Sequence, residues 1–356
     1  MDYPELPSDL ERFFSVDYQT ARERFRASAD ALDAVTYSHS VCSEQDLTID
    51  VAVIGPANKP AVVVSSGVHG VEGFFGSAIQ LALMFQLTEN PQFLSDCRCQ
   101  FILIHAVNPY GFKHLRRCNE DNADLNRNFL EEPQAYEGAP HGYADLDSFL
   151  NPKSPPRFDF FLLRALWKIV SVGMGKLTAS VARGQYCFPQ GLFFGGSKPS
   201  KSYEVLKQEL KNWFGDVDKI LLLDFHTGLG RHGTYEIYPS GTQDIAWYTK
   251  HFHSQVRTAR YDVDGDFATW FKNQKLAKSV RSMLCEFGTY HILWVLSALR
   301  NENRLHHFSK DWSVGDAAKQ ELLERFCPKS TKWRRSTVSQ GLAIISRAVT
   351  AVTTEE

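Results

Sequence analysis

Short apolar runs, each ending at a turn, are the feature that most constrains the fold of this chain. Ala61-Val62-Val63-Val64 is typical of a buried β-strand, and similar runs occupy residues 101–106, 220–225 and 282–287. Residues 47–54 alternate well enough to predict one more strand. Near-continuous apolar strands that alternate with helical segments indicate a sheet covered on both faces. We therefore expect an α/β fold with helices on both faces of a central sheet.

The helical segments are predicted from apolar positions at helical spacing. They cover residues 17–33, 74–88, 158–171, 202–214, 291–299 and 339–352. No Ser/Gly-rich linker divides the chain, so we expect a single domain over residues 1–356. Within it we expect an N-terminal helix at 17–33, an insertion at about 131–218 packed on the same domain, and a C-terminal helical segment at about 316–353.

Two candidate metal ligands follow the strand at residues 61–64. His69 and Glu72 lie in a glycine-rich turn, and they form the only His-x-x-Glu in the chain. A neutral imidazole nitrogen and a carboxylate oxygen are two of the ligand types that Zn²⁺ takes in a tetrahedral site. A turn histidine beside a solvated glutamate would give the same pattern, so the pair needs support from other residues.

That support comes from polar side chains at the ends of other strands. His226 and Glu286 each lie at the end of an apolar run, and residues 108–127 follow a third. Ligands bind at the carboxyl ends of strands in open α/β sheets. Asp224 precedes His226 by two positions, so both side chains share a face of an extended segment and the carboxylate can orient the imidazole. The alternatives are a hydrogen-bonded histidine that caps a strand and a glutamate paired at the sheet edge.

Composition and charge exclude several classes of function. The chain has 356 residues, 43% hydrophobic and 22% charged, and its formal net charge of −2 gives no electrostatic footprint for nucleic acid or an anionic membrane. No apolar run approaches the roughly 20 residues needed to span a bilayer. The N-terminal residues do not resemble a signal peptide, and the seven cysteines form no Cys-x-x-Cys pair. We expect a soluble cytoplasmic protein with reduced thiols.

A family resemblance rests on three motifs between the candidate ligands. These are Asn108-Pro109-Tyr110-Gly111, Arg117-Cys118-Asn119 and Asp124-Leu125-Asn126-Arg127-Asn128-Phe129. Together with His69-x-x-Glu72, His226 and Glu286, their order resembles the zinc carboxypeptidase superfamily, which includes murein-peptide amidases and the aspartoacylase/succinylglutamate desuccinylase branch. The full pattern looks most like a bacterial domain-of-unknown-function branch of that superfamily. The resemblance implies a carboxypeptidase-like fold with a mixed central sheet.

The resemblance also implies roles for individual residues. His69, Glu72 and His226 would hold one Zn²⁺ per chain and leave a position open for water, whose pKa the metal lowers toward about 7. Glu286 would be the general base. The resemblance also gives roles to arginine and asparagine side chains. Arg117 would stabilise the oxyanion, with Arg116 as its competitor, and Asn126 and Arg127 would clamp a substrate carboxylate. A solvated arginine and an ion pair at a helix start are the structural alternatives for these residues.

Two departures from the family pattern stand out. The spacing between Glu72 and His226 is long, and the insertion at about 131–218 accounts for it. The substrate-contacting tyrosine of the carboxypeptidases has no clear counterpart. The candidates are Tyr235, Tyr238, Tyr261 and Tyr290.

The function implied is zinc-dependent hydrolysis of an amide bond in a short peptide or N-acyl amino acid that bears a free carboxylate. The motifs do not choose between a carboxypeptidase and an N-acyl amino acid deacylase. The alternative from another class is a metal-free or inactive binding protein on the same fold. A serine hydrolase of the usual α/β type is disfavoured because the chain has no Gly-x-Ser-x-Gly turn. The oligomeric state stays open.

Overall fold

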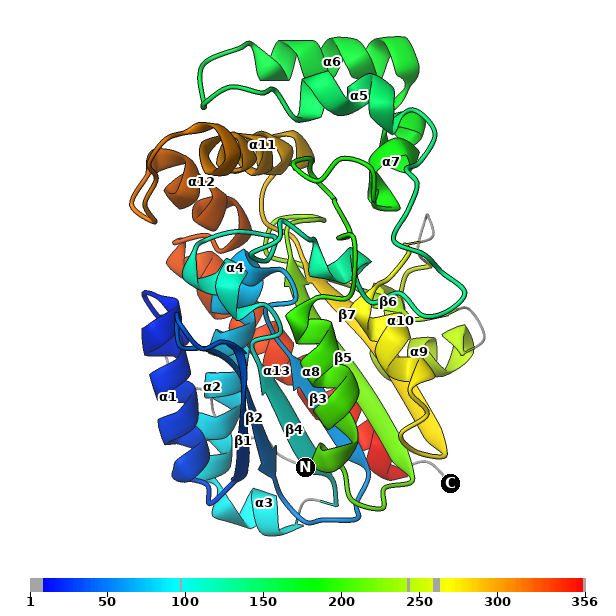
Figure 1. The fold of residues 1–356 in the computed structure, drawn as a ribbon. Coiled ribbons are helices and arrows are strands. Elements are labelled where there is room, and N and C mark those ends of the chain that lie inside the picture. The colour runs from blue at the N-terminus through cyan, green and yellow to red at the C-terminus, as the bar shows by residue number, and fades with distance from the viewer. Residues whose placement is uncertain (1–8, 97, 242–243, 259–262, 355–356) are drawn as a thin grey trace.

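A mixed sheet of seven strands forms the centre of the molecule (Figure 1). The computed structural model describes residues 9–96, 98–241, 244–258 and 263–354. In order across the sheet, the strands are β1 (Val35–Cys42), β2 (Leu47–Ile54), β4 (Gln100–His105), β3 (Ala61–Ser65), β5 (Lys219–Thr227), β7 (Ser279–Phe287) and β6 (Tyr235–Pro239). The four central strands β4, β3, β5 and β7 are parallel, β2 and β6 pair with this group antiparallel, and β1 pairs antiparallel with β2. The mixed α/β fold expected from the sequence is confirmed.

The apolar runs became the inner strands because both faces of these strands are covered. Every residue of β3 and β4 is buried, as are residues 220–227 of β5. The sequence analysis did not predict β1 or β6. Both are edge strands whose residues are partly exposed, so neither carries the continuous apolar signal.

Helices cover both faces of this sheet. Their bounds are α1 (Tyr18–Asp30), α2 (Gly73–Glu89), α3 (Pro91–Asp96), α4 (Pro109–Lys113), α5 (Tyr143–Leu150), α6 (Phe161–Val172), α7 (Met174–Ala182), α8 (Lys201–Glu209), α9 (Ile245–Phe252), α10 (Phe267–Asn273), α11 (Ile292–Phe308), α12 (Ala317–Phe326) and α13 (Thr331–Thr354). The helices predicted at 17–33, 74–88, 158–171, 202–214, 291–299 and 339–352 correspond to α1, α2, α6, α8, α11 and α13. The chain leaves α8 through a short 3₁₀ turn (Leu210–Trp213), and α11 and α13 are longer than predicted.

Two hydrophobic clusters lie on opposite faces of the sheet. One joins α1, α2 and α13 to one face, with Phe25, Phe75 and Ile345 among its buried members. The other joins α8 and α10 to the opposite face through residues such as Leu206 and Trp270. No helix in the described ranges has both the length and the apolar character needed to cross a bilayer.

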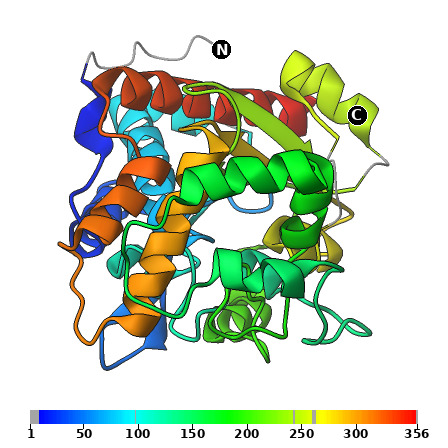
Figure 2. The same cartoon turned by 90° about the horizontal axis from the view of Figure 1, so that it is seen from above.

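Residues 131–218 form the segment expected to be an insertion, and it contains α5 to α8. α5, α6 and α7 lie beyond the carboxyl ends of the parallel strands, at the top of Figure 1. Viewed from above, they lie over that end of the molecule, between α13 on one side and α8 on the other (Figure 2). A small cluster that includes Tyr143, Phe149 and Phe161 holds α5 against α6.

Candidate metal centre

The turn after β3 is held by close backbone packing against the segment after β4. The backbone N–H of Gly70 donates to the carbonyl of Arg117 (3.2 Å), and that of Val71 donates to the carbonyl of Arg116 (2.8 Å). A Cβ atom at Gly70 would lie 2.1 Å from the backbone carbon of Gly111, so only glycine fits this approach. The contact fixes the 3₁₀ turn Gly70–Glu72 and therefore the positions of His69 and Glu72.

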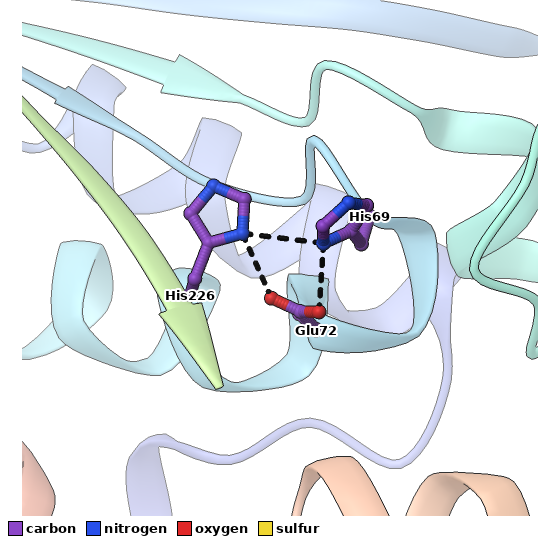
Figure 3. Close-up of side chains that lie close together, drawn as sticks. All are labelled: His69, Glu72 and His226. Atoms are coloured by element: carbon purple, nitrogen blue, oxygen red, sulfur yellow. Dashed lines mark hydrogen bonds and ion pairs between the residues drawn. The ribbon is translucent and has the colours of Figure 1, made fainter. Parts of the chain in front are cut away.

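His69, Glu72 and His226 converge on one point at the carboxyl ends of β3 and β5 (Figure 3). Nδ1 of His69 lies 2.8 Å from Oε1 of Glu72, and Nδ1 of His226 lies 3.1 Å from Oε2 of the same carboxylate. The two Nδ1 atoms are 3.2 Å apart. All three side chains are buried. The three side chains that the sequence placed after the ends of two strands thus lie together in the structure.

A carboxylate fixes the far nitrogen of each imidazole. Nε2 of His226 lies 2.6 Å from Oδ2 of Asp224, as the spacing of these two residues predicted. Nε2 of His69 lies 3.0 Å from Oδ1 of Asp124, a partner that the sequence analysis did not assign. Its only signal in the sequence was its place at the start of the Asp-Leu-Asn-Arg-Asn-Phe motif. A carboxylate on Nε2 favours the tautomer that leaves Nδ1 as an acceptor.

This donor set fits a divalent cation. When both Nε2 atoms donate to carboxylates, the two Nδ1 lone pairs and the Glu72 carboxylate face one another. A cation between them would accept all three as ligands. In the protein without a cation, charge interactions among the same side chains shift their pKa values. Although burial alone would raise the pKa of Glu72, the neighbouring His69 and His226 hold it well below its usual value. Burial would lower the pKa of His226, but Asp224 and Glu72 raise it well above the ordinary value.

Glu286 lies beside this cluster on the neighbouring strand. It pairs in register with His226 across β5 and β7, and its Oε1 accepts a hydrogen bond from the backbone N–H of Leu229 (2.8 Å). Burial, aided by the negative charge of Glu72, raises the pKa of Glu286 to about 7. A carboxyl group with such a pKa can take up and release a proton near neutral pH.

Arg117 faces the same cluster, whereas Arg116 does not. Nε of Arg117 donates to Oδ2 of Asp124 (2.8 Å), and its Nη1 lies 3.8 Å from Oε1 of Glu72. Arg116 is buried in an ion network in which Glu302 accepts from its Nε (2.8 Å) and from Nζ of Lys319 (2.5 Å). Of the two arginines, Arg117 is therefore the one that lies next to Glu72, whereas Arg116 pairs with Glu302.

Asn126 and Arg127 lie in the 3₁₀ turn Leu125–Arg127, which Asp124 caps by accepting from the N–H of Asn126 (3.1 Å). Oδ1 of Asn126 accepts from the N–H of Phe267 (3.0 Å), and Nη1 of Arg127 donates to the carbonyl of Asn126 (2.7 Å). Both residues are almost fully buried. Asp124 thus links the turn that carries them to His69.

Three of the four candidate tyrosines bind other side chains. The hydroxyls of Tyr238 and Tyr290 donate to Glu236 (2.7 Å) and Glu324 (2.6 Å), and that of Tyr235 accepts from Arg347 (3.1 Å). Tyr261 lies outside the described residues.

Comparisons with solved structures identify the fold as that of the metallocarboxypeptidases. A structure of thrombin-activatable fibrinolysis inhibitor superposes with a TM-score of 0.55 at 13% identity, covering 98% of this chain and 77% of that one. The bovine protein in complex with tick carboxypeptidase inhibitor superposes at 0.52 with 11% identity, covering 95% and 97%. No curated protein sequence matches significantly. Residues 14–340 match a single family, so the chain belongs to the family described as "Protein of unknown function (DUF2817)" and has the zinc-carboxypeptidase fold.

Proposed function

We propose that this protein is a zinc-dependent hydrolase that cleaves an amide bond in a carboxylate-bearing short peptide or N-acyl amino acid. The observation that carries the proposal is the convergence of His69, Glu72 and His226, each within 3.2 Å of a neighbour, next to Glu286. Two imidazoles and a carboxylate are the ligand set of many catalytic zinc sites. Zinc in such a site acidifies water and polarises a carbonyl group.

The protein's own residues supply the remaining steps. Glu286 takes the proton of the attacking water and returns it to the leaving amine, for which its raised pKa suits it. Arg117 stabilises the carbonyl oxygen as negative charge develops there: Asp124 holds its Nε, and its Nη1 lies on the side of the ligand cluster, 3.8 Å from Oε1 of Glu72. Asn126 and Arg127 bind the substrate carboxylate, for which a planar guanidinium is well matched.

Two enzyme classes fit, and they differ in the acyl part of the substrate rather than in the leaving group. A carboxypeptidase releases a C-terminal amino acid from a peptide, and a deacylase releases an amino acid from an acyl group, so one carboxylate clamp serves both. The fold favours the carboxypeptidase, since a neighbour with this fold is bound to a carboxypeptidase inhibitor. Six free cysteines in the described part of the chain favour a reducing, cytoplasmic setting, in which turnover of short peptides or acyl amino acids is the fitting task.

Elemental analysis followed by a substrate screen tests the proposal. Protein purified without chelator and offered zinc should retain about one ion per chain, and His69→Ala and His226→Ala should lose it. The screen should compare dipeptides, N-acyl amino acids and their C-terminal amides. Full-length protein that binds no metal would refute the zinc site. Protein that binds zinc but cleaves no amide in the screen would instead favour a binding protein on the same fold.

A further inference from the structure

The outer face of α6 exposes large apolar side chains that no part of the described chain covers. Leu163, Leu166, Trp167 and Val170 are 64%, 51%, 66% and 87% exposed, and they recur at the spacing of one helix face. The opposite face of the helix, with Phe161 and Ala165, packs on α5. A soluble surface rarely gathers so many exposed large apolar side chains without a binding role.

Adjacent segments extend this surface, which we call the α6 face. Phe158 and Phe160 precede the helix and are 83% and 60% exposed, and Met174 follows it at 45%. In Figure 1, α6 also lies at the end of the molecule farthest from the sheet. The molecule therefore presents apolar groups at one projecting end.

Basic side chains flank the α6 face. Arg164 is exposed three positions before Trp167, Lys168 is partly exposed one turn after Arg164 toward the side of Phe161, and Lys176 is exposed on α7. From residue 160 to residue 203 the chain has six lysines and arginines and no acidic residue. The acidic groups just before this stretch have partners or lie on another helix: Asp159 pairs with Arg300 and, at 3.9 Å, with Nη1 of Arg164, and Asp145 and Asp147 belong to α5. The whole-chain charge of −2, from which we expected no membrane contact, conceals this local excess.

We propose that the α6 face binds the surface of an anionic lipid bilayer. A helix with one apolar face, tryptophan at its edge and lysine or arginine alongside is the pattern of an interfacial helix that lies in the headgroup region. The basic residues match anionic headgroups, and the tryptophan suits the boundary between wet and apolar layers. This binding does not depend on the proposed hydrolase activity.

A second copy of the chain fits the α6 face less well. A two-fold dimer through this face would bring the same patch of each copy together, so the basic residues Arg164 and Lys168 of both copies would share one interface. Like charges facing one another across an interface disfavour association. An anionic bilayer satisfies both the apolar and the basic groups.

The orientation has a consequence for the metal centre. The carboxyl ends of β3, β5 and β7, where His69 and His226 lie, point toward the end of the molecule that carries α6 (Figure 1). A bilayer bound at the α6 face would therefore lie on the same end of the protein as the metal centre.

Vesicle co-sedimentation of the full chain tests the proposal. Wild-type protein should bind vesicles of mixed phosphatidylglycerol and phosphatidylcholine, and it should bind pure phosphatidylcholine much more weakly. The double variant Trp167→Ser/Val170→Ser should lower the partition coefficient roughly 10²-fold, and Lys168→Glu about tenfold. Added salt should weaken wild-type binding. A matched control, Val16→Ser/Val35→Ser, removes exposed apolar groups (81% and 58%) outside the α6 face and should bind like the wild type.

Three outcomes would overturn the proposal. Wild-type protein that does not sediment with anionic vesicles excludes lipid binding, and equal binding by wild type and the Trp167/Val170 variant moves it away from α6. Light scattering that shows a dimer which Trp167→Ser/Val170→Ser dissociates, without vesicle binding, would assign the face to a second copy instead. Circular dichroism of the variants checks that the exposed substitutions leave the fold intact.

Discussion

Oδ2 of Asp224 lies 2.6 Å from Nε2 of His226, and this contact turns Nδ1 of the same ring toward Glu72. The carboxylate itself is fixed on its other oxygen, since Oγ of Ser65 donates to Oδ1 (2.6 Å). β3 and β5 thus cooperate to orient one imidazole. Such partners of ligating histidines fix the tautomer and raise the basicity of the ring.

Asp224→Asn should therefore weaken metal binding without removing a ligand. We expect an affinity for Zn²⁺ lower by roughly 10–100-fold, because an amide neither favours the Nε2–H tautomer nor carries negative charge. Competition with a zinc chelator would measure it. Asp218→Asn, an exposed ion-pair residue just before the same strand, is the control and should keep wild-type affinity. Equal affinities for the two variants would contradict the orienting role.

Glu286→Gln should separate catalysis from metal binding. Glutamine keeps the shape and can still accept from the N–H of Leu229, but it cannot take a proton. We expect kcat to fall by roughly 10²–10⁴-fold while the zinc content stays at about one ion per chain. Glu236→Gln, at the position that pairs with Glu286 across β6 and β7, is the matched control. Near-normal turnover by Glu286→Gln with full metal content would show that another group is the base.

The sequence predicted the contacts that are local or periodic. The pairing of Asp224 with His226 follows from a spacing of two in a strand, and the buried strands follow from their apolar runs. The contact of Asp124 with His69 was not predictable in this way, because 55 positions separate the two residues. The strands β1 and β6 were also not predicted, because edge strands contain both polar and apolar residues and lack a continuous apolar run.

For helix α6, the sequence predicted the helix but not which of its faces is exposed. Its apolar residues predicted a helix correctly, but periodicity does not say which apolar face is buried. Phe161 and Ala165 pack inward, while Leu163 and Trp167 face outward. Only the arrangement of α5 and α6 distinguishes the two sets.

The Arg116–Glu302–Lys319 network should contribute to stability more than to turnover. All three side chains are buried, so Glu302→Gln leaves two cations without compensation. Breaking a buried pair typically costs about 3–5 kcal/mol. Urea denaturation would measure this loss in the free energy of unfolding. Glu321→Gln, which breaks the partly exposed pair with Arg325, should cost about 1 kcal/mol or less.

Stability should fall on acidification because His105 is buried in the neutral form. Burial lowers the pKa of His105 to about 4 from 6.5; Arg22 and Arg26 add to the lowering, and Asp50 opposes it. Between these pH values the unfolded chain binds a proton that the folded chain does not, so stability rises with pH across that window and this residue has no effect above it. The contribution is on the order of 3 kcal/mol.

His105→Gln would isolate that contribution. Glutamine does not titrate and can still meet Oγ of Ser77, which lies 3.1 Å from Nε2 of His105. Unfolding free energies at pH 4, 5 and 7 should show a shallower decline for the variant than for the wild type. Parallel curves for the two proteins would mean that His105 is not the titrating group.

Substitutions of Arg117 and Arg127 should differ in kinetic effect. If Arg127 binds a carboxylate that is charged throughout the reaction, Arg127→Ala should mainly raise KM and narrow the preference for free acids over amides. If Arg117 meets charge that develops only during attack, Arg117→Lys should mainly lower kcat, by roughly 10²–10³-fold if it behaves like other oxyanion donors. Because Arg117 also binds Asp124, both variants need their zinc content measured before kinetics. Wild-type protein that cleaves amides as well as acids would contradict the carboxylate clamp and the substrate class proposed with it.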